Sequence, residues 1–313
     1  MDPLGSVLTA PRAEGAFLLR SILNPPWSLR IQDEAPLTVI AVVRGEAWLL
    51  PDHSPPTSLR PGDVAIVRGP DRYTVADHPA TAPTVIIHPG QISTTMDGET
   101  LCEVMDLGVR SWGDSVDGAS LMLTGTYQQR SEIGRLLLGT LPAVIVVRDE
   151  GWDCPYLALL SAEMTSQEAG QEVVLDRLLD LVLLATLREW LSREDSPTPR
   201  WYRAAGDPVV ATALESMQSE PGRPWTVASL AAGSGVSRAA FARRFTELVG
   251  APPMAYLTEW RLALAADLLR EPEATIGSVA RHVGYGSAFA LSTAFKRIRG
   301  VSPTQYRSIA AAG

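Results

Sequence analysis

The chain has 313 residues, of which 46% are hydrophobic and 20% charged, and its formal net charge at pH 7 is −8. Two cysteines, Cys102 and Cys154, are too few for a disulfide scaffold or a cysteine-ligated zinc site. No apolar run is long enough to span a membrane, because the most apolar segment, "LLDLVLLATL", is interrupted by Asp180.

The N-terminal segment, "MDPLGSVLTAPRAEG", has an acid at position 2 and no apolar stretch. It therefore does not look like a signal peptide. Together with the low cysteine content, this predicts a cytoplasmic protein that does not contact a membrane. The length allows two domains of ordinary size.

Short β-branched runs that end at Pro, Gly or Asp follow this segment. They include "SLRIQ", "LTVIAVVRGEAWLL", "VAIVRG", "RYTVA" and "TVIIHPG". Many short strands separated by frequent turns favour a β-sandwich or a barrel. Further along, "SLMLTGTYQ" predicts another strand, and "SEIGRLLLGTL" predicts a short helix with Ser131 as its N-cap and Arg135 on its outer face. We assign all of these elements to a first domain of residues 1–167.

A long helix is predicted over residues 168–193, with acids near its start and arginines near its end, as the helix dipole favours. Its apolar residues form two neighbouring stripes: Val174, Leu178, Leu181 and Ala185, and Leu175, Leu179, Val182 and Trp190. So wide an apolar face fits either a core or the seam of a dimer. We expect a dimerisation helix.

The polar segment that follows, "SREDSPTPRWYRAAGDP", contains three prolines. This composition predicts a linker, which we place at residues 194–208, ahead of a helical domain of residues 209–313. The charge changes sign nearby. Residues 1–200 contain 15 basic and 27 acidic side chains, whereas residues 201–313 contain 12 basic and 8 acidic ones. The C-terminal part is therefore expected to meet an anion.

Two stretches of the C-terminal part share one pattern: "TVASLAAGSGVSRAAFARRFTELVG" and "TIGSVARHVGYGSAFALSTAFKRIRG". Each begins with a Thr that can cap a helix and places an Ala four residues before a Gly. An apolar residue and a Ser follow that Gly, and an arginine-bearing helix then ends at Gly250 or Gly300.

This spacing has a physical reading. The small Ala lets two helices cross closely, and the Gly supplies the left-handed turn between them. The Ser caps the second helix, whose N-terminus can then meet phosphate. The pattern therefore predicts two helix-turn-helix motifs, each with a recognition helix for the DNA major groove. The apolar helix between them, "PPMAYLTEWRLALAADLLREP", is expected to be a rigid spacer.

The segment 206–309 resembles the DNA-binding domain of the AraC/XylS family of bacterial transcription regulators, and the closing "GVSPTQYR" is especially typical. The resemblance implies sequence-specific binding to operator DNA, with the two recognition helices in successive major grooves.

The resemblance also implies residue roles by position. In the first recognition helix, Ala239 and Arg243 would face the groove, and Ser237, Arg238 and Arg244 would touch phosphates. In the second, Ala288, Phe289 and Thr293 would face the groove, with Ser287 and Lys296 near the backbone. The second helix is short of base-reading donors, so Arg243 is the main candidate for reading guanine. Periodicity places four further side chains in the core: Phe241, Phe245, Leu291 and Phe295.

The first domain resembles the cupin-type sensor domain common in this family, through "VRGEAWLL" and "LRPGDVAIVRGPDRYTV". Metal-binding cupins carry a conserved His in the second of these halves, where the corresponding positions of this chain hold Arg68, Pro70 and Tyr73. Their first half would need a His near residues 38–40, where this chain has Thr38, Val39 and Ile40. We therefore expect no metal and no cofactor. A small organic effector is expected inside the barrel, beside three aromatic residues that fit a plain core equally well: Trp27, Trp48 and Tyr73.

Other readings stay open at this point. His53, His78 and His88 could form a metal site, and Cys102 or Cys154 could make the regulator redox-responsive. A cupin oxygenase or isomerase with a helical appendage is a rival, as is a helical protein-interaction module. Our prediction is an α+β multidomain, non-enzymatic regulator, with a cupin-like barrel and an all-α domain of two helix-turn-helix motifs. Its expected partners are double-stranded DNA, a second copy, an effector and RNA polymerase.

Overall fold

The computed structural model describes residue 13 and residues 15–128, 131–193 and 199–312. The chain divides into two compact units. One contains the described residues of 11–130 and 141–196, and the other contains residues 131–140 together with the described residues from 199 onward. The domains predicted from the sequence are continuous stretches of the chain. The compact units are not continuous, because residues 131–140 pack with the C-terminal helices.

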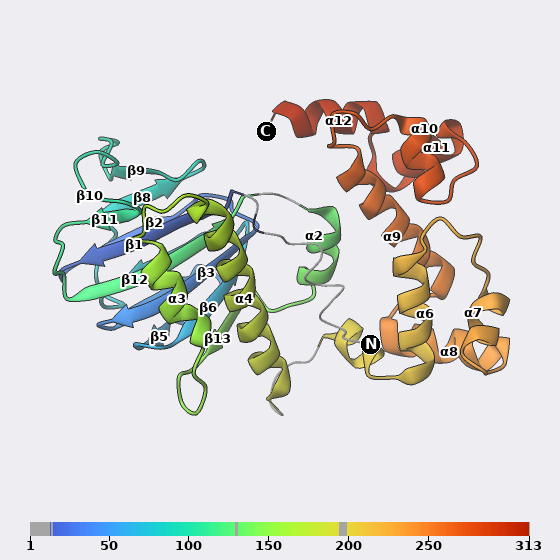
Figure 1. Cartoon of the computed structure of the whole chain (residues 1–313), viewed down its shortest axis with the longest axis horizontal. Coiled ribbons are helices and arrows are strands. Elements are labelled where there is room, and N and C mark those ends of the chain that lie inside the picture. The colour runs from blue at the N-terminus through green and yellow to red at the C-terminus, as the bar shows by residue number, and fades with distance from the viewer. Residues whose placement is uncertain (1–12, 14, 129–130, 194–198, 313) are drawn as a thin grey trace. The chain divides into compact units, whose positions relative to one another are not determined.

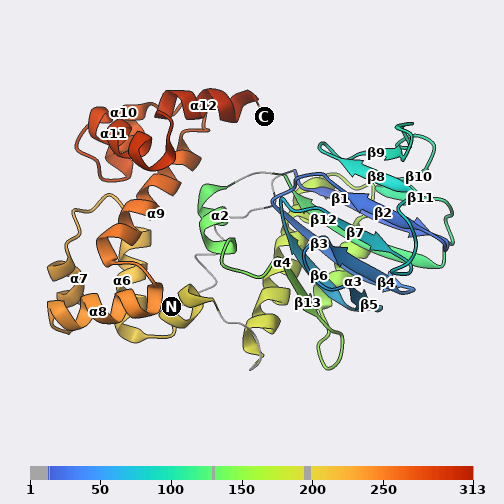
Figure 2. The ribbon, with the colours of Figure 1, turned by 180° about the vertical axis from the view of Figure 1, so that it is seen from behind.

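Two facing β-sheets form the first unit (Figures 1 and 2). The larger has the order β10 (Asp106–Gly108), β11 (Ser111–Gly113), β1 (Phe17–Leu23), β12 (Ser120–Tyr127), β3 (Leu37–Arg44), β6 (Val64–Arg68) and β13 (Val144–Val147). The smaller has the order β5 (Thr57–Leu59), β4 (Ala47–Pro51), β7 (Tyr73–Ala76), β2 (Ser28–Ile31), β8 (Val85–His88) and β9 (Ile92–Thr95). Each run named from the sequence contains a strand, "LTVIAVVRGEAWLL" contains two, β3 and β4, and the predicted cupin-like class is confirmed.

The core of this unit lies between the two sheets. It includes Leu29 of β2 and Trp27, which directly precedes β2, together with Ile40 and Val42 of β3. Each of these side chains is less than 9% exposed. Antiparallel pairing of β12 with both β1 and β3 places the longest strands at the centre of the larger sheet. Alternate residues of these strands therefore face the interior.

Helices α3 (Pro155–Glu163) and α4 (Gln171–Ser192) belong to the same unit. A Cβ on Gly125 of β12 would lie only 2.3 Å from a methyl carbon of Leu179, so α4 packs directly on the larger sheet. The Asp180 carboxylate of α4 also accepts hydrogen bonds from the Tyr127 hydroxyl at 3.1 Å and from the Ala13 amide at 2.9 Å.

The structure separates the two apolar stripes of α4. Leu175, Leu179, Val182 and Trp190 are buried within the first unit. The other stripe is left at the surface: Val174 is 44% and Leu181 36% exposed, and Leu178 and Ala185 are partly exposed. One stripe is thus core, and the other has no cover within the described residues.

The second unit is helical. Its C-terminal helices are α5 (Arg200–Ala205), α6 (Pro208–Ser219), α7 (Val227–Gly233), α8 (Arg238–Val249), α9 (Pro253–Leu268), α10 (Ile276–His282), α11 (Ala288–Arg299) and α12 (Pro303–Ala312). Residues 200–205 were expected in the linker but form α5, whose Ala204 is fully buried in a core. Residues 194–198 of that linker lie outside the described residues.

Two small cores stabilise this unit, and α9 contributes to both. Leu257 belongs to the first core, with Phe241 and Phe245, whereas Leu262 and Ala265 belong to the second. The two cores occupy opposite ends of one continuous 16-residue helix. This arrangement confirms the expected spacer.

Helix α2 (Glu132–Leu138) confirms the short helix expected after "SLMLTGTYQ". Its N-cap is Ser131, whose hydroxyl accepts a hydrogen bond from the Gly134 amide at 3.0 Å. Although α2 lies in sequence between β12 and β13, it belongs to the helical unit. Within the described residues, no helix is both long and apolar enough to cross a membrane.

Candidate nucleic-acid interface

The first helix-turn-helix motif consists of α7 and α8. The Thr226 hydroxyl accepts from the Ser229 amide, and the Ser229 hydroxyl accepts from the Thr226 amide, so a capping box begins α7. Gly235 has a φ of +68°, in the left-handed region, and the Val236 amide donates back to the Ala231 carbonyl at 3.2 Å.

The second motif, α10 and α11, repeats this construction. Thr275 and Ser278 form the same capping box. Gly284 has a φ of +82°, and the Tyr285 amide donates to the Ala280 carbonyl at 2.8 Å. Equal caps and equal turns at matched positions confirm the two predicted motifs.

The inner faces of both motifs agree with the sequence prediction. Ala231 and Ala280, where the helices cross, are at most 2% exposed. The four side chains expected in the core are fully buried: Phe241, Phe245, Leu291 and Phe295. The ring of Phe295 meets Tyr306 edge-on at 5.5 Å between centroids. These contacts fix the rotation of each recognition helix about its axis, and so determine which residues point outward.

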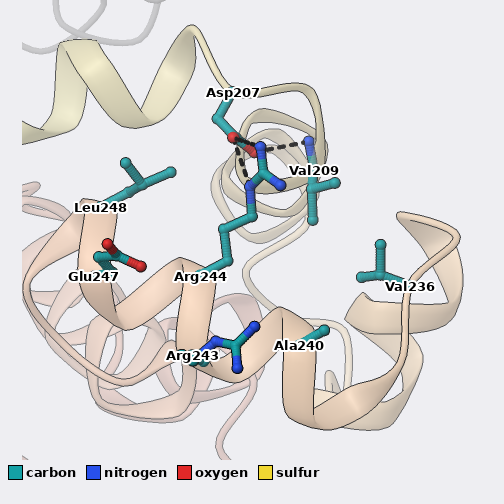
Figure 3. A pocket seen from close by; sticks show the side chains of 8 residues that line it. All are labelled: Asp207, Val209, Val236, Ala240, Arg243, Arg244, Glu247 and Leu248. Atoms are coloured by element: carbon teal, nitrogen blue, oxygen red, sulfur yellow. Dashed lines mark hydrogen bonds and ion pairs between the residues drawn. The ribbon is translucent and has the colours of Figure 1, made fainter.

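The outer face of α8 presents most of the residues predicted to contact DNA. Ser237 caps the helix through the Ala240 amide at 3.2 Å, and Arg238, Ala239 and Arg243 are exposed. A hollow beside α8 is lined by Val236, Ala240, Arg243 and Glu247, with Asp207 and Val209 from the start of α6 (Figure 3).

Arg244 lies differently from its neighbour Arg243. Its Nε donates to the Asp207 carboxylate at 2.7 Å (Figure 3). The same carboxylate caps α6 by accepting from the Val209 and Val210 amides, each at 3.1 Å. Burial acts to raise the pKa of Asp207, but Arg244 and these amides outweigh it and lower the pKa. Arg244 therefore ties α8 to α6.

The outer face of α11 is less polar. Ser287 caps the helix through the Ala290 amide at 3.1 Å, and Ala288, Phe289, Thr293 and Lys296 are exposed. Phe289 is 81% exposed, which is unusual for so large an apolar side chain. The Thr293 hydroxyl donates to the Phe289 carbonyl at 3.0 Å, so one of the few polar groups on this face is occupied by the helix itself.

The structure adds a residue that the sequence reading overlooked. Arg261 of α9 donates to the Pro221 and Arg223 carbonyls, both at 2.7 Å. The loop between α6 and α7 is thereby pinned to the spacer helix. A Cβ on Gly284 would lie 2.8 Å from both the Gly222 carbonyl oxygen and the Arg261 guanidinium. This junction fixes the turn of the second motif against the first half of the unit. The sequence signal for this role was Arg261 itself, a charged residue within a largely apolar predicted helix.

Comparison with known proteins identifies this arrangement. A cupin family model matches residues 2–192, and a helix-turn-helix domain model matches residues 230–309. A putative AraC-like transcription regulator from Streptomyces lividans is 33% identical, with 98% of each chain covered. One from Streptomyces antibioticus is 32% identical, again with 98% of each chain covered. The chain belongs to the AraC family of transcription regulators.

Among solved structures, the C-terminal domain of AraT, a response regulator from Geobacillus stearothermophilus, is 35% identical over 33% of this chain and 86% of that chain, with a TM-score of 0.32. Both Streptomyces relatives, which this chain matches over 98% of their length, carry the name of putative AraC-like transcription regulators. This AraC-family protein is therefore a double-stranded-DNA-binding regulator and not an enzyme.

The first unit of this AraC-family regulator contains a half-open cavity of about 360 Å³, lined by residues of both sheets. Apolar and aromatic side chains supply much of the lining, including Leu19, Ile31, Tyr73 and Trp112. Thr124 and Thr126 of β12 line it as well. The indole nitrogen of Trp112 is buried and has no hydrogen-bond partner in the described part of the chain.

The three aromatic residues expected to contact an effector are placed differently from one another. Tyr73 lines the cavity, and burial raises the pKa of its hydroxyl well above the ordinary value. Trp27 is packed in the closed core, where its indole nitrogen donates to the Ser120 hydroxyl at 3.1 Å. Trp48 is half-buried on β4 and does not line the cavity. Trp112 was not singled out from the sequence.

The cysteines and the three candidate histidines of the first unit are scattered. Cys102 lines the cavity, with its sulfur 3.3 Å from the Ser93 hydroxyl. Cys154 is buried at the start of α3, and burial raises the pKa of its thiol. His53 and His78 are exposed, and His88 is 2.9 Å from the Thr94 hydroxyl. Among the residues that the structure describes, no group of three potential ligands is arranged to hold a metal.

Proposed function

We propose that this AraC-family regulator binds operator DNA with α8 and α11 in two successive major grooves. The observation that supports this is the repeated motif. Both recognition helices bury their inward-facing residues completely, namely Phe241 and Phe245 in α8 and Leu291 and Phe295 in α11, and leave the residues predicted to contact DNA exposed. A shared spacer, α9, gives the two helices one fixed separation.

The residue roles follow from what each side chain already contacts. In Figure 3 no interaction joins Arg243 to the other residues of the hollow, so its guanidinium is available for bidentate contact with guanine. Arg238, at the first position of α8, lies where the helix N-terminus approaches phosphate. Arg244 can reach phosphate only by leaving Asp207, so we assign it a smaller share of DNA binding.

The second recognition helix is proposed to contribute mainly affinity for its groove, and little discrimination between base sequences. Ala288 and Phe289 offer apolar contact to thymine methyl groups, and Ser287 and Lys296 offer contacts to the backbone. With the Thr293 hydroxyl engaged by the helix, α11 has few groups that would distinguish one base pair from another by hydrogen bonding.

We further propose that the regulator acts as a homodimer joined through the exposed stripe of α4. Val174, Leu178, Leu181 and Ala185 recur at spacings of four, three and four residues, the period of a coiled-coil seam. Acids lie at the start of this helix and Arg188 near its end, so an antiparallel second copy would place opposite charges side by side.

The cavity is proposed to bind a small, mainly apolar effector that carries a hydrogen-bond acceptor. Its volume suits a molecule of modest size, and the apolar side chains of its lining would bury that molecule's surface. The Trp112 indole, buried without a partner, is the group that an acceptor would satisfy. Tyr73 would contact this molecule, whereas Trp27 and Trp48 would act only through the packing around it.

A redox-responsive alternative rests on Cys102, which lines the same cavity. Its sulfur is held by Ser93, and the only other cysteine, Cys154, is buried. We therefore favour the organic effector. The regulator is expected to work in the cytoplasm, with RNA polymerase as a further partner.

Binding titrations of the full chain test the proposal. The first probe is a duplex from upstream of its own gene, and the second is an equally long duplex of shuffled sequence. We expect tighter binding to the first and a steep loss of affinity for both as salt rises, because arginines displace counterions. Equal affinity for the two duplexes, or no binding at low salt, would contradict it.

A further inference from the structure

Helix α2 lies in sequence between strands of the first unit, but it packs with the helical, DNA-binding unit. It lies between β12 and β13, which both belong to the larger sheet of the sensor unit. Its packing partner is α9, the spacer between the two recognition motifs. The described contacts of α2 with this unit involve three elements: α9, α11 and α12.

The first contact is made by Asp267 of α9. Its carboxylate accepts hydrogen bonds from the Ser131 hydroxyl at 2.9 Å, the Glu132 amide at 2.7 Å and the Ile133 amide at 3.1 Å. Asp267 is the penultimate residue of α9, where the helix dipole disfavours a negative charge. Burial also raises the pKa of this carboxyl. The cost to α9 is offset by the three donors at the start of α2.

The second contact is made by Glu132, the first residue of α2. Its carboxylate accepts from Arg299 at 2.5 Å and lies 3.5 Å from the Tyr306 hydroxyl of α12. Arg299 is the last residue of α11, the second recognition helix. Both charged side chains are about 85% buried, with 16% of Arg299 and 15% of Glu132 exposed. Glu132 also pairs with Arg135 of its own helix, and that arginine is 65% exposed.

We propose that α2 positions the second recognition helix, by joining Asp267 at the end of α9 and Arg299 at the end of α11. Because its guanidinium is paired with Glu132, Arg299 fixes the position of α11 and does not contact DNA. The groove-facing residues of α11 lie one to three turns earlier and stay exposed, so the docked α2 is compatible with DNA binding.

The same connection offers a route for regulation, and this part rests on the proposed effector site. Thr124 and Thr126 of β12 line the sensor cavity, and α2 begins six residues after Thr126. A ligand that changes the end of β12 would then affect the start of α2, where Ser131 and Glu132 make their contacts with Asp267 and Arg299. The second recognition helix would then respond to the sensor, whereas α8 has no described contact with α2.

Hydrogen–deuterium exchange of the full-length protein tests docking without DNA. In Asp267→Ala and in Glu132→Ala, amides of residues 131–138 should exchange about tenfold faster than in the parent protein. Alanine favours helix, so α9 itself should stay protected. The matched control is Arg135→Ala, which removes the exposed partner of Glu132 and should leave exchange unchanged. Equal protection of α2 in all proteins would overturn the docking.

DNA binding then tests positioning. Two duplexes are compared: the bound upstream duplex, and a shortened version that ends before the groove of α11, because α11 is proposed to make mainly backbone contacts. Glu132→Ala should weaken binding to the first about fivefold and to the second less than twofold. Arg135→Ala should change neither. An equal loss on both duplexes, or no loss where α2 has lost its protection, would overturn the proposal. If the parent protein binds neither duplex, the proposed function fails, while the exchange result still stands.

Discussion

At the scale of single residues, two arginines of α8 that are five positions apart are expected to do different work. Arg238 begins the helix, beside the Ser237 cap, and Arg243 lies one and a half turns later on the exposed face. A phosphate contact adds affinity to every sequence, whereas a base contact separates one sequence from another. Replacing each arginine by alanine distinguishes these roles.

Arg238→Ala should weaken binding to specific and shuffled duplexes alike, and it should reduce the slope of log K against log salt by about one. Arg243→Ala should instead cost about 1–3 kcal/mol on the specific duplex and relax the preference at one base pair. Titrations at several salt concentrations, with single-base variants of the duplex, measure both. If the two variants behave alike, the assigned roles are wrong.

Asp207 combines a helix cap with an ion pair to Arg244, so its loss should be felt in stability. We expect Asp207→Ala to lower the free energy of unfolding by about 1–2 kcal/mol, measured by urea denaturation at pH 7. Because the folded-state pKa of this carboxyl is lowered, its contribution is present above the unfolded pKa of about 3.9 and is lost as the pH falls below it. The difference between variant and parent should therefore shrink in acid. Glu215→Ala, on the exposed side of α6, is the control and should have little effect.

At the scale of elements, the repeated motif was predictable because its determinants are local. Caps, turn glycines and the apolar period all act within a few residues, so "TVASLAAGSGV" and "TIGSVARHVGYG" specify the same turn. The docking of α2 could not be predicted in this way. Asp267 lies 135 positions from the amide that it accepts from, and nothing near Glu132 in sequence points to Arg299.

The two turn glycines offer a test of the junction at Arg261. Both have positive φ, so Ala at either position should cost about 1 kcal/mol through the left-handed backbone. A Cβ on Gly235 meets nothing within 4 Å, but one on Gly284 would clash with the Gly222 carbonyl and Arg261. Gly284→Ala should therefore cost about 1–3 kcal/mol more than Gly235→Ala in thermal or urea unfolding. Equal costs would mean that the junction is not rigid.

At the scale of the whole molecule, the sequence left open whether the apolar face of α4 was core or dimer seam. The structure divides the face: Gly125 lets Leu179 and its stripe pack against the larger sheet, whereas Val174 and Leu181 of the other stripe stay exposed. The cavity was harder to place. Trp48 and Tyr73 lie in strands and Trp27 directly precedes one, and only the pairing of strands decides which of the three lines the pocket.

Leu181→Glu places a charge in the exposed stripe of α4 and should convert the dimer to a monomer without unfolding it, because Leu181 is already 36% exposed. Sedimentation equilibrium at micromolar concentration measures the change. Leu159→Glu on α3, where the side chain is 55% exposed, is the matched control and should stay dimeric. A parent protein that is monomeric throughout this range would contradict the seam.

A hydroxyl-radical footprint of the full-length regulator on DNA upstream of its own gene tests the central claim most directly. Two recognition helices on one spacer predict, for each protomer, two protected tracts on one face of the duplex, about 10 base pairs apart. Protection of a single tract for each protomer, or of two tracts on opposite faces, would contradict the claim that α8 and α11 occupy successive major grooves.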